Sequence, residues 1–384
     1  MTEIFLTIFF ISVLLFFLGS GIWVALSMIG VSAIGMMLFT SRPVGDAMAT
    51  TIWGTSSSWT LTALPLFVWM GEILFRTKLS ENLFKGLSPW MQKLPGGLIH
   101  VNVVGCALFA AISGSSAATV ATVGKMSIPE LRKRKYPEKI LLGSLAGSGT
   151  LGLLIPPSII LIIYGVAVQE SIAKLFIAGI IPGIMIALIF MSYVIIWSLI
   201  NKKEMPKILE EYSFFEKVKR SKQLLPVIIL ILAVIGSIYT GIATATEAAS
   251  LGVVGALILS YFQKSLTLET FKSSLLGATK TSCMIAFILA GSTFLSLAMG
   301  FTGLPRNLAI WIQNMDLSPY VLIFVLMIFY IILGMFLDGI SAVVLTMAII
   351  EPMIRQAGFD MIWFGIFLVI VVEMAQITPP VGFN

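Results

Sequence analysis

Long apolar runs, separated by short polar and basic segments, set the hydropathy pattern of this 384-residue chain. Several runs approach the roughly 20 residues that an α-helix needs to span a bilayer. Because such runs recur from end to end, the pattern predicts an all-α polytopic membrane protein. The clearest runs are Ile22–Phe39, Ile140–Val168, Ile180–Ile200, Leu224–Tyr239, Ala248–Phe262 and Tyr320–Leu337.

The composition agrees with a membrane location. Charged residues make up only 11% of the chain, whereas a soluble domain carries about 25%. The first apolar run follows Glu3 with no basic segment before it, so we expect a membrane helix and not a cleaved signal peptide. Ser80–Lys93 has an apolar face at helical spacing, which predicts a helix in the membrane interface, and Leu266–Leu276 repeats the pattern.

The basic residues predict the orientation. Twenty of the 24 Lys and Arg residues fall in four short segments, Arg76–Lys93, Lys125–Lys139, Lys202–Lys222 and Lys264–Lys280. Positive loops stay on the cytoplasmic side of a membrane. We therefore place these four segments in the cytoplasm, which puts the N-terminus outside, on the periplasmic side.

Two polar, helix-breaking stretches interrupt the apolar runs at matching positions. One reads A-I-S-G-S-S around Gly114, and the other reads F-L-D-G-I-S around Gly339. Each leads to a single proline and, 27 residues later, to a Pro-Pro pair that begins at Pro156 or Pro379. Matched breaks in two halves of a membrane chain predict an internal repeat with a transport site at the broken helices.

The predicted topology inverts the two halves. Leu98–Ser127 lies between two cytoplasmic segments, so it enters and leaves on one side as a re-entrant hairpin that turns at Ser113–Ser116. Tyr320–Arg355 lies between loops poor in basic residues and is expected to enter from outside, with its turn at Asp338–Ser341. Two hairpins of opposite orientation predict an inverted-repeat transporter with broken transmembrane helices.

This topology divides the chain into four predicted segments. Comparison of the two repeats also predicts a further apolar half-helix beyond Asn384, so the fourth segment is expected to be incomplete at its C-terminal end. The segments are scaffold helices and an interfacial helix in 1–95; a first transport repeat in 96–180, with its hairpin at 97–127 and a broken helix at 139–168; scaffold helices and cytoplasmic connections in 181–280; and a second transport repeat in 281–384, with its hairpin at 320–355 and a broken helix at 361–384.

Several polar residues have both a structural and a functional interpretation. Small residues in membrane helices often serve only close packing, but two matched copies favour a site. Asp338 is a candidate for the site or for a cap near the surface. Glu247 is expected to close a capping box with Thr244. Glu373 is equally consistent with an ion pathway and with a helix partner.

Enzyme chemistry finds little support. The only histidine is His100, and the two cysteines, Cys106 and Cys283, sit in apolar runs and are expected to be packed thiols. The chain has no G-x-x-x-x-G-K-[ST] motif for ATP. We therefore expect a transporter and not an enzyme, with no cofactor other than Na⁺ as a coupling ion. Backbone carbonyls freed at helix breaks suit such a cation, and half-helix N-termini suit a carboxylate.

At these motifs the chain resembles a known family over essentially its whole length. The stretches A-L-F-A-A-I-S-G-S-S-A-A-T-V-A-T-V-G, G-S-G-T-L-G-L-L-I-P-P-S, F-I-A-G-I-I-P-G, A-T-A-T-E-A-A and G-M-F-L-D-G…I-T-P-P-V-G are similar to the large membrane subunit of tripartite ATP-independent periplasmic (TRAP) transporters, in the ion-transporter superfamily. The resemblance implies an elevator-type transporter that uses Na⁺ to drive uptake of an organic acid, such as sialic acid or a C4-dicarboxylate. It also implies two partners, a periplasmic substrate-binding protein and a small four-helix membrane subunit of the Q type.

The resemblance also implies site residues. Sodium is expected at Ser113, Gly114, Ser115, Ser116, Gly147, Ser148 and Thr150 in the first half, and at Asp338, Gly339, Ser341, Gln376, Thr378 and Pro379 in the second. Substrate is expected at Ser115, Ser116, Pro156, Ser341 and Pro380. Two alternatives remain at this point: a stand-alone Na⁺-coupled anion carrier that needs no binding protein, and a channel-like or structural membrane scaffold.

Overall fold

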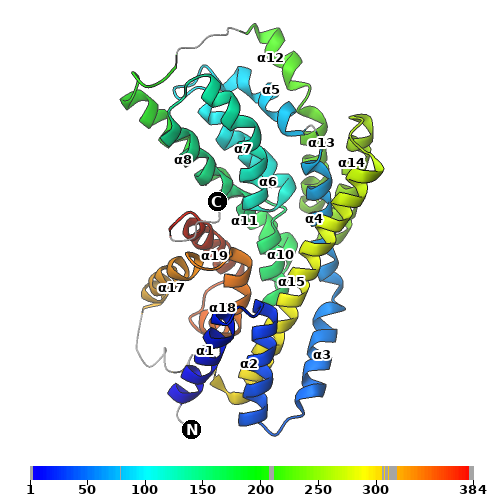
Figure 1. Cartoon of the computed structure of the whole chain (residues 1–384), viewed down its shortest axis with the longest axis vertical. Helices are drawn as coiled ribbons and strands as arrows, with labels where there is room; N and C mark the ends of the chain where they lie inside the picture. Colours follow the sequence, from blue (N-terminus) through cyan, green and yellow to red (C-terminus); the bar gives the residue numbers. More distant parts are fainter. Residues whose placement is uncertain are drawn as a thin grey trace. The chain divides into compact units, whose positions relative to one another are not determined.

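The computed structural model describes residues 3–379 except 78, 207–211, 305–306, 308–309 and 311–317. Within these residues all regular secondary structure is helical (Figure 1), which confirms the predicted all-α class. The helices are α1 (Glu3–Gly19), α2 (Val24–Phe39), α3 (Val44–Ser56), the short 3₁₀ helix η1 (Trp59–Thr62), α4 (Ala63–Phe75), α5 (Leu79–Met91), α6 (Ile99–Ser113), α7 (Ser116–Lys133), α8 (Glu138–Gly149), α9 (Leu151–Leu154), α10 (Ile159–Ala167), α11 (Ile172–Ile200), α12 (Phe214–Ser221), α13 (Leu225–Tyr239), α14 (Ala245–Phe262), α15 (Leu268–Thr302), α17 (Pro319–Gly334), α18 (Gly339–Gln356) and α19 (Met361–Gln376).

Many of these helices suit a bilayer. By length and composition, four of the described helices are able to cross a membrane: α11, α14, α15 and α18. The number rises to seven if each helix pair that bends at a short break is counted as one span. One such pair is α8–α9 with α10, where the break between Leu154 and Ile159 contains the Pro156–Pro157 pair. The broken transmembrane helix predicted at 139–168 covers this bent pair and, as a membrane span, stays a prediction.

The helices gather into two compact units. Unit 1 comprises the chain up to Thr62, Ile162–Ser171, and the described chain from Thr281 onward. Unit 2 comprises Ala63–Leu161 and Ile172–Lys280. The two hairpins therefore belong to different units, the first to unit 2 and the second to unit 1.

Unit 2 is built around α4, α14 and the first hairpin. Helix α14 begins with the predicted capping box: Thr244 Oγ1 accepts from the Glu247 backbone N–H, and the Glu247 carboxylate accepts from the Thr244 N–H at 2.8 Å. The helix packs against α4, where a Cβ added at Gly252 would come within 2.5 Å of the Met70 sulfur. The reciprocal capping satisfies two backbone donors at the start of the helix, so the structural interpretation of Glu247 is confirmed.

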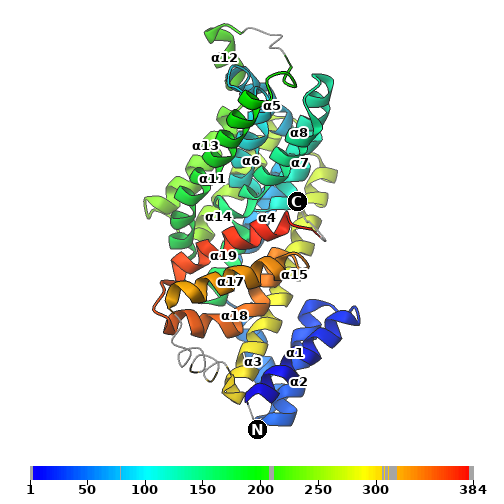
Figure 2. The same ribbon diagram turned by 90° about the vertical axis from the view of Figure 1, so that its left-hand side faces the viewer.

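Unit 1 contains the second hairpin. Figure 2 shows α17, α18 and α19 stacked beside one another. The end of α10 also belongs to this unit: the Tyr164 hydroxyl donates to the Met361 carbonyl at 2.6 Å, and its ring lies against Gly365. A Cβ at Gly365 would come within 2.5 Å of that ring, so a small residue on α19 permits this contact.

Two predicted interfacial helices have different outcomes. The first of them, predicted at Ser80–Lys93, corresponds to the helix α5, which ends at Met91 and whose Leu83, Phe84 and Leu87 are buried. Its position in a membrane stays a prediction. Leu266–Leu276 does not form a separate helix, because α15 continues without a break from Leu268 to Thr302. No proline interrupts that range, so nothing ends the helix after the first three turns.

Candidate functional site

The first hairpin turns where the sequence predicted. Helix α6 ends at Ser113, Gly114 adopts a left-handed conformation with φ 59°, and Ser115 is extended with φ −138° before α7 begins. A left-handed residue at the end of a helix favours glycine, which has no Cβ to clash. The S-G-S-S sequence therefore supplies both the turn and its flanking hydroxyl groups.

Oxygen atoms concentrate at this hairpin tip. The Ser115 carbonyl accepts from the Thr119 hydroxyl at 2.7 Å, from the Thr119 N–H at 3.1 Å and from the Ser113 hydroxyl at 3.2 Å. The Ser113 and Thr119 hydroxyl groups also lie 2.8 Å apart. Ser116 is buried and Ser115 is half-buried. Neutral carbonyl and hydroxyl oxygens of this kind are the ligands that broken transporter helices offer to Na⁺.

The tip packs directly on the broken helix. The Ile159 N–H donates to the Gly114 carbonyl at 3.2 Å. A Cβ added at Gly152 would come within 2.6 Å of the Ser115 carbonyl oxygen and the Ser116 Cα, and one at Gly114 within 2.6 Å of the Pro157 carbonyl. The structure therefore brings Ser113–Ser116 together with the α9 segment and the proline pair. Gly152 was not among the predicted site residues, although its place in G-S-G-T-L-G was visible.

The rest of the first predicted set has mixed positions. The Thr150 hydroxyl donates to the Gly147 carbonyl at 2.6 Å, and Gly147 lies against Phe190 of α11. Ser148 is fully buried, and its hydroxyl has no hydrogen-bond partner among the described residues. Pro156 is also buried. The Thr150–Gly147 hydrogen bond thus lies next to the break in the helix. The Ser148 hydroxyl is a buried oxygen within unit 2 that could accept a ligand.

The base of the first hairpin is fixed to the start of α8. The Tyr136 hydroxyl accepts from the Leu98 N–H at 3.0 Å, and Arg132 pairs with Glu138 at 2.7 Å. Burial raises the pKa of the Tyr136 phenol, so this group stays protonated at neutral pH. Further along, the Asn102 amide donates to the Leu141 carbonyl and to the Ser144 hydroxyl at 3.0 Å. A lone asparagine in an apolar run was the sequence signal for this last contact, and Asn102 was not among the predicted residues.

The second hairpin turns slightly earlier than expected. Helix α17 ends at Gly334 and α18 begins at Gly339, so the turn occupies Met335–Asp338 and not Asp338–Ser341. Asp338 is the N-cap of α18, and its carboxylate accepts from the Ser341 N–H at 3.1 Å. Gly339 and Ser341 are buried in the first turn of the helix. Asp338 is half-buried. Its carboxylate therefore caps the helix and is still partly exposed at the turn.

The end of α19 lies beside the end of α17. A Cβ added at Gly334 would come within 2.6 Å of the Ala375 Cβ. Gln376 is the last residue of α19 and is buried, as is Glu373 three residues earlier. The Thr378 hydroxyl donates to the Met374 carbonyl at 3.0 Å, and Pro379 is exposed. Pro380, predicted to contact substrate, lies outside the described residues.

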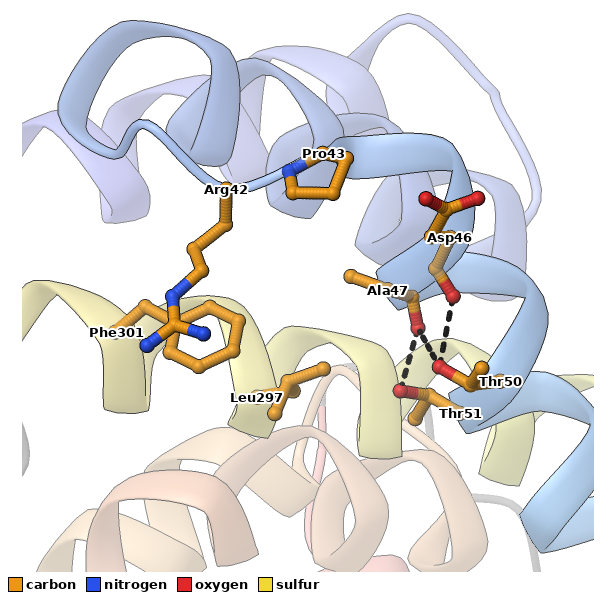
Figure 3. Close-up of a pocket in the computed structure, with 8 residues that line it drawn as sticks. All are labelled: Arg42, Pro43, Asp46, Ala47, Thr50, Thr51, Leu297 and Phe301. Atoms are coloured by element: carbon orange, nitrogen blue, oxygen red, sulfur yellow. Dashed lines mark hydrogen bonds between the residues drawn. The ribbon is translucent and has the colours of Figure 1, made fainter.

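Unit 1 also contains a pocket that none of the predicted site residues lines. It has a volume of about 430 Å³ and lies between the start of α3 and α15 (Figure 3). Its lining includes one basic and one acidic residue, together with one aliphatic and one aromatic residue of α15. The lining residues are Arg42, Pro43, Asp46, Ala47, Thr50, Thr51, Leu297 and Phe301.

Clusters of classical metal ligands do not occur in the part of the chain that the structure describes. No group of three or more His, Cys, Asp or Glu side chains is placed to hold a metal ion there. The oxygen-rich hairpin tip is a different type of site, because it offers carbonyl and hydroxyl groups.

Comparison with known proteins identifies the family. The family model described as the tripartite ATP-independent periplasmic transporter, DctM component, matches residues 9–384. The chain belongs to the TRAP transporter large permeases. This confirms the resemblance of the sequence motifs. Because the family consists of transporters, and because the chain has many apolar helices, it is a multi-pass inner-membrane transport protein and not an enzyme.

Several TRAP large permeases align with most of the chain. The C4-dicarboxylate permease of Pseudomonas aeruginosa is 33% identical over 92% of this chain and 82% of its own length. The sialic acid permease of Vibrio cholerae is 31% identical over 94% of this chain and 84% of its own length. The 2,3-diketo-L-gulonate permease of Escherichia coli is 31% identical over 87% and 78%. All three relatives are named for organic acids.

Proposed function

We propose that the chain is the large transmembrane subunit of a sodium-driven secondary transporter that imports an organic acid. A periplasmic binding protein delivers the acid, and an elevator movement carries it across the membrane. The observation that carries the proposal is the first hairpin tip, where the carbonyl and hydroxyl oxygens of Ser113–Ser116 close on a proline-broken helix. In a TRAP large permease, this arrangement suits a coupling cation.

The sodium sites of this proposal follow the two breaks. In the first half, the tip oxygens act together with the backbone of Gly147, Ser148 and Thr150. In the second half, the turn that ends at Asp338 acts together with Gly339, Ser341 and the segment Gln376–Pro379. The packing of Gly334 against Ala375 supports this second group, because it places the ends of α17 and α19 side by side.

The substrate contacts of this proposal divide between the hairpins by charge. The N-terminus of α7 is capped by Ser115, a neutral residue, whereas the N-terminus of α18 is capped by the Asp338 carboxylate. A helix N-terminus attracts an anion through its unpaired N–H groups and its dipole. The substrate carboxylate is therefore assigned to Ser115 and Ser116 beside Pro156, and Asp338 favours a cation. Ser341 and Pro380 complete the proposed substrate contacts.

The basic loops of the sequence support opposite entry of the hairpins, because they place both ends of the first hairpin in the cytoplasm and leave few positive charges around the second. Each hairpin also has an anchor within its own unit. Arg132 of the first pairs with Glu138 of α8, and Arg355 of the second donates to the Val168 carbonyl at 3.0 Å. An inverted repeat requires two hairpins of opposite orientation, and the proposal includes an elevator movement of the hairpin-bearing parts.

The proposal includes two protein partners. The family name describes a tripartite transporter, and a relative from Oleidesulfovibrio alaskensis is named as an isethionate permease of the DctMQ type. We therefore assign to this chain a small four-helix membrane subunit and a periplasmic binding protein. The relatives named above differ in their organic acids, so substrate choice is assigned mainly to the binding protein.

Reconstitution tests this proposal. The chain, its small subunit and the binding protein encoded beside it would be placed in liposomes with radiolabelled succinate or N-acetylneuraminate as probes. Uptake of one probe is expected to need both the binding protein and an inward Na⁺ gradient. It should collapse when K⁺ or choline replaces Na⁺.

Each other outcome rejects a part of the proposal. Uptake without the binding protein would indicate a stand-alone anion carrier. Full uptake driven by a pH gradient alone would reject the sodium assignment. A flux of the probe that ignores both gradients would indicate a channel-like scaffold.

A further inference from the structure

Two opposite charges line the pocket of unit 1 without pairing with each other. Arg42 lies in the loop before α3, and Asp46 lies in the first turn of α3 (Figure 3). Within the described residues, neither side chain forms an ion pair. Opposite charges that share a pocket but stay apart suit a ligand that carries both charges.

The Arg42 side chain is held in a geometry that suits an oxyanion. Its guanidinium carbon lies 5.1 Å from the centroid of the Phe301 ring (Figure 3). A guanidinium placed over a ring is stabilised by cation–π attraction and keeps its N–H groups for other partners. These N–H groups match the oxygens of a phosphate in a bidentate arrangement. Arg42 therefore supplies an anion-binding edge at one side of the pocket.

The rest of the pocket is less polar. Pro43, Ala47 and Leu297 contribute apolar surface. The Thr50 and Thr51 hydroxyl groups donate to backbone carbonyls of their own helix at 2.7 Å. The hydroxyl protons of these threonines are therefore used within α3, and Asp46 is the acidic residue among those that line the pocket.

The pocket lies near the C-terminal ends of two apolar helices, α2 and α15. Arg42 follows the last residue of α2 by three positions, and Phe301 is the residue before the end of α15. Met37 and Leu38, in the last turn of α2, are 69% and 61% exposed. None of the residues of α3 is buried. In a membrane protein this combination places the charges among lipid headgroups and the exposed aliphatic side chains against acyl chains.

We propose that this pocket binds the headgroup of phosphatidylethanolamine. The lipid phosphate binds Arg42, its ammonium group binds Asp46, and its glycerol region covers Leu297 and Phe301. The ammonium retains N–H donors for the Asp46 carboxylate, whereas the trimethylated ammonium of phosphatidylcholine has none. Phosphatidylglycerol has no cation for Asp46. The inference rests on membrane insertion of the chain and not on sodium coupling.

Native mass spectrometry of the purified full chain tests the inference. The protein would be delipidated and then exposed to equal amounts of phosphatidylethanolamine, phosphatidylcholine and phosphatidylglycerol. The wild type is expected to retain phosphatidylethanolamine in preference to the other two. Arg42→Gln should weaken its retention about tenfold, as expected for the loss of one charge-assisted hydrogen-bonded contact. Asp46→Asn should remove the preference over phosphatidylglycerol while retaining the phosphate contact.

A matched variant and a soluble probe complete the test. Lys139→Gln, at an exposed position of α8, removes one positive charge far along the sequence and should leave the lipid preference unchanged. A melting curve of each variant in detergent checks that the fold is retained. Equal retention of the three lipids by the wild type, or an unchanged preference in Arg42→Gln, would overturn the inference. So would binding of soluble glycerophosphoethanolamine as tight as that of the lipid.

Discussion

Arg355 of the second hairpin donates a hydrogen bond of 3.0 Å to the carbonyl oxygen of Val168, 187 residues earlier in the sequence. Val168 directly follows α10, and the last carbonyls of a helix have no partner within it. Arg355 also lies 2.9 Å from a Glu351 oxygen and 3.7 Å from a Glu170 oxygen. One side chain of α18 therefore connects this helix to the segment that follows α10.

Replacing this arginine should loosen unit 1. We expect Arg355→Met to lower the free energy of unfolding by about 1–2 kcal/mol, because a hydrogen bond from a charged group is lost at a half-exposed position. Thermal melting of the purified protein in detergent measures the effect. Arg132→Met is the matched control, since Arg132 and Glu138 are both more than half exposed and such pairs contribute less than about 1 kcal/mol. Equal losses in the two variants would contradict the connecting role of Arg355.

The contact between the first hairpin tip and α9 predicts a glycine requirement. Gly152→Ala would push a methyl group to 2.6 Å from backbone atoms of Ser115 and Ser116. Overpacking against backbone costs roughly 1–3 kcal/mol, so we expect a lower melting temperature and strongly reduced transport. Gly143→Ala on α8 is the control, because a Cβ there meets nothing within 4 Å. That variant should be as stable as the wild type or slightly more stable.

The two aspartate caps of unit 1 separate capping from ion binding. Asp338 caps α18, and Asp360 caps α19 by accepting from the Trp363 N–H at 2.8 Å. Asparagine caps a helix about as well as aspartate, so both Asp→Asn variants should keep their stability. Only Asp338→Asn should raise the Na⁺ concentration needed for half-maximal uptake. If Asp338→Asn and Asp360→Asn showed the same Na⁺ dependence as the wild type, Asp338 would be a cap alone.

Labelling of single cysteines tests the opposite entry of the hairpins. Cys106 would be replaced by alanine and Cys283 by serine, and single cysteines would then be placed at Lys133 and Ser318, which are both exposed. A membrane-impermeant maleimide should reach position 133 only from the cytoplasmic side and position 318 only from the periplasmic side. Labelling of both positions from one side would reject the inverted repeat.

Local signals predicted the parts of the fold that depend on neighbours in sequence. The Thr244–Glu247 capping box and the left-handed Gly114 follow from residues within one turn, so the sequence revealed both. The turn at Asp338 was placed too late, because Asp338 was interpreted as the first residue of the turn. In the structure the aspartate ends the turn and caps the next helix.

Contacts between distant segments were beyond the reach of the sequence pattern. The hydrogen bond from Arg355 to Val168 and the packing of Gly152 on Ser115 depend on where helices meet in space. The predicted helix at Leu266–Leu276 failed for the opposite reason. Its apolar face was real, but a local face does not show where a helix ends when no breaker follows it.

The Ser115 carbonyl oxygen has a consequence for the energetics of ion exchange. It already accepts from two hydroxyl groups and one N–H of its own hairpin. A Na⁺ ion that binds there, as proposed, must displace the hydroxyl protons of Ser113 and Thr119, which then turn their lone pairs to the ion. Binding becomes a substitution of one partner for another, so its net free energy is smaller than the strength of the ion–oxygen contacts. When the Na⁺ ion leaves, the same hydroxyl groups again donate to the Ser115 carbonyl. This lowers the free-energy cost of releasing the ion and so favours its release in the proposed transport cycle.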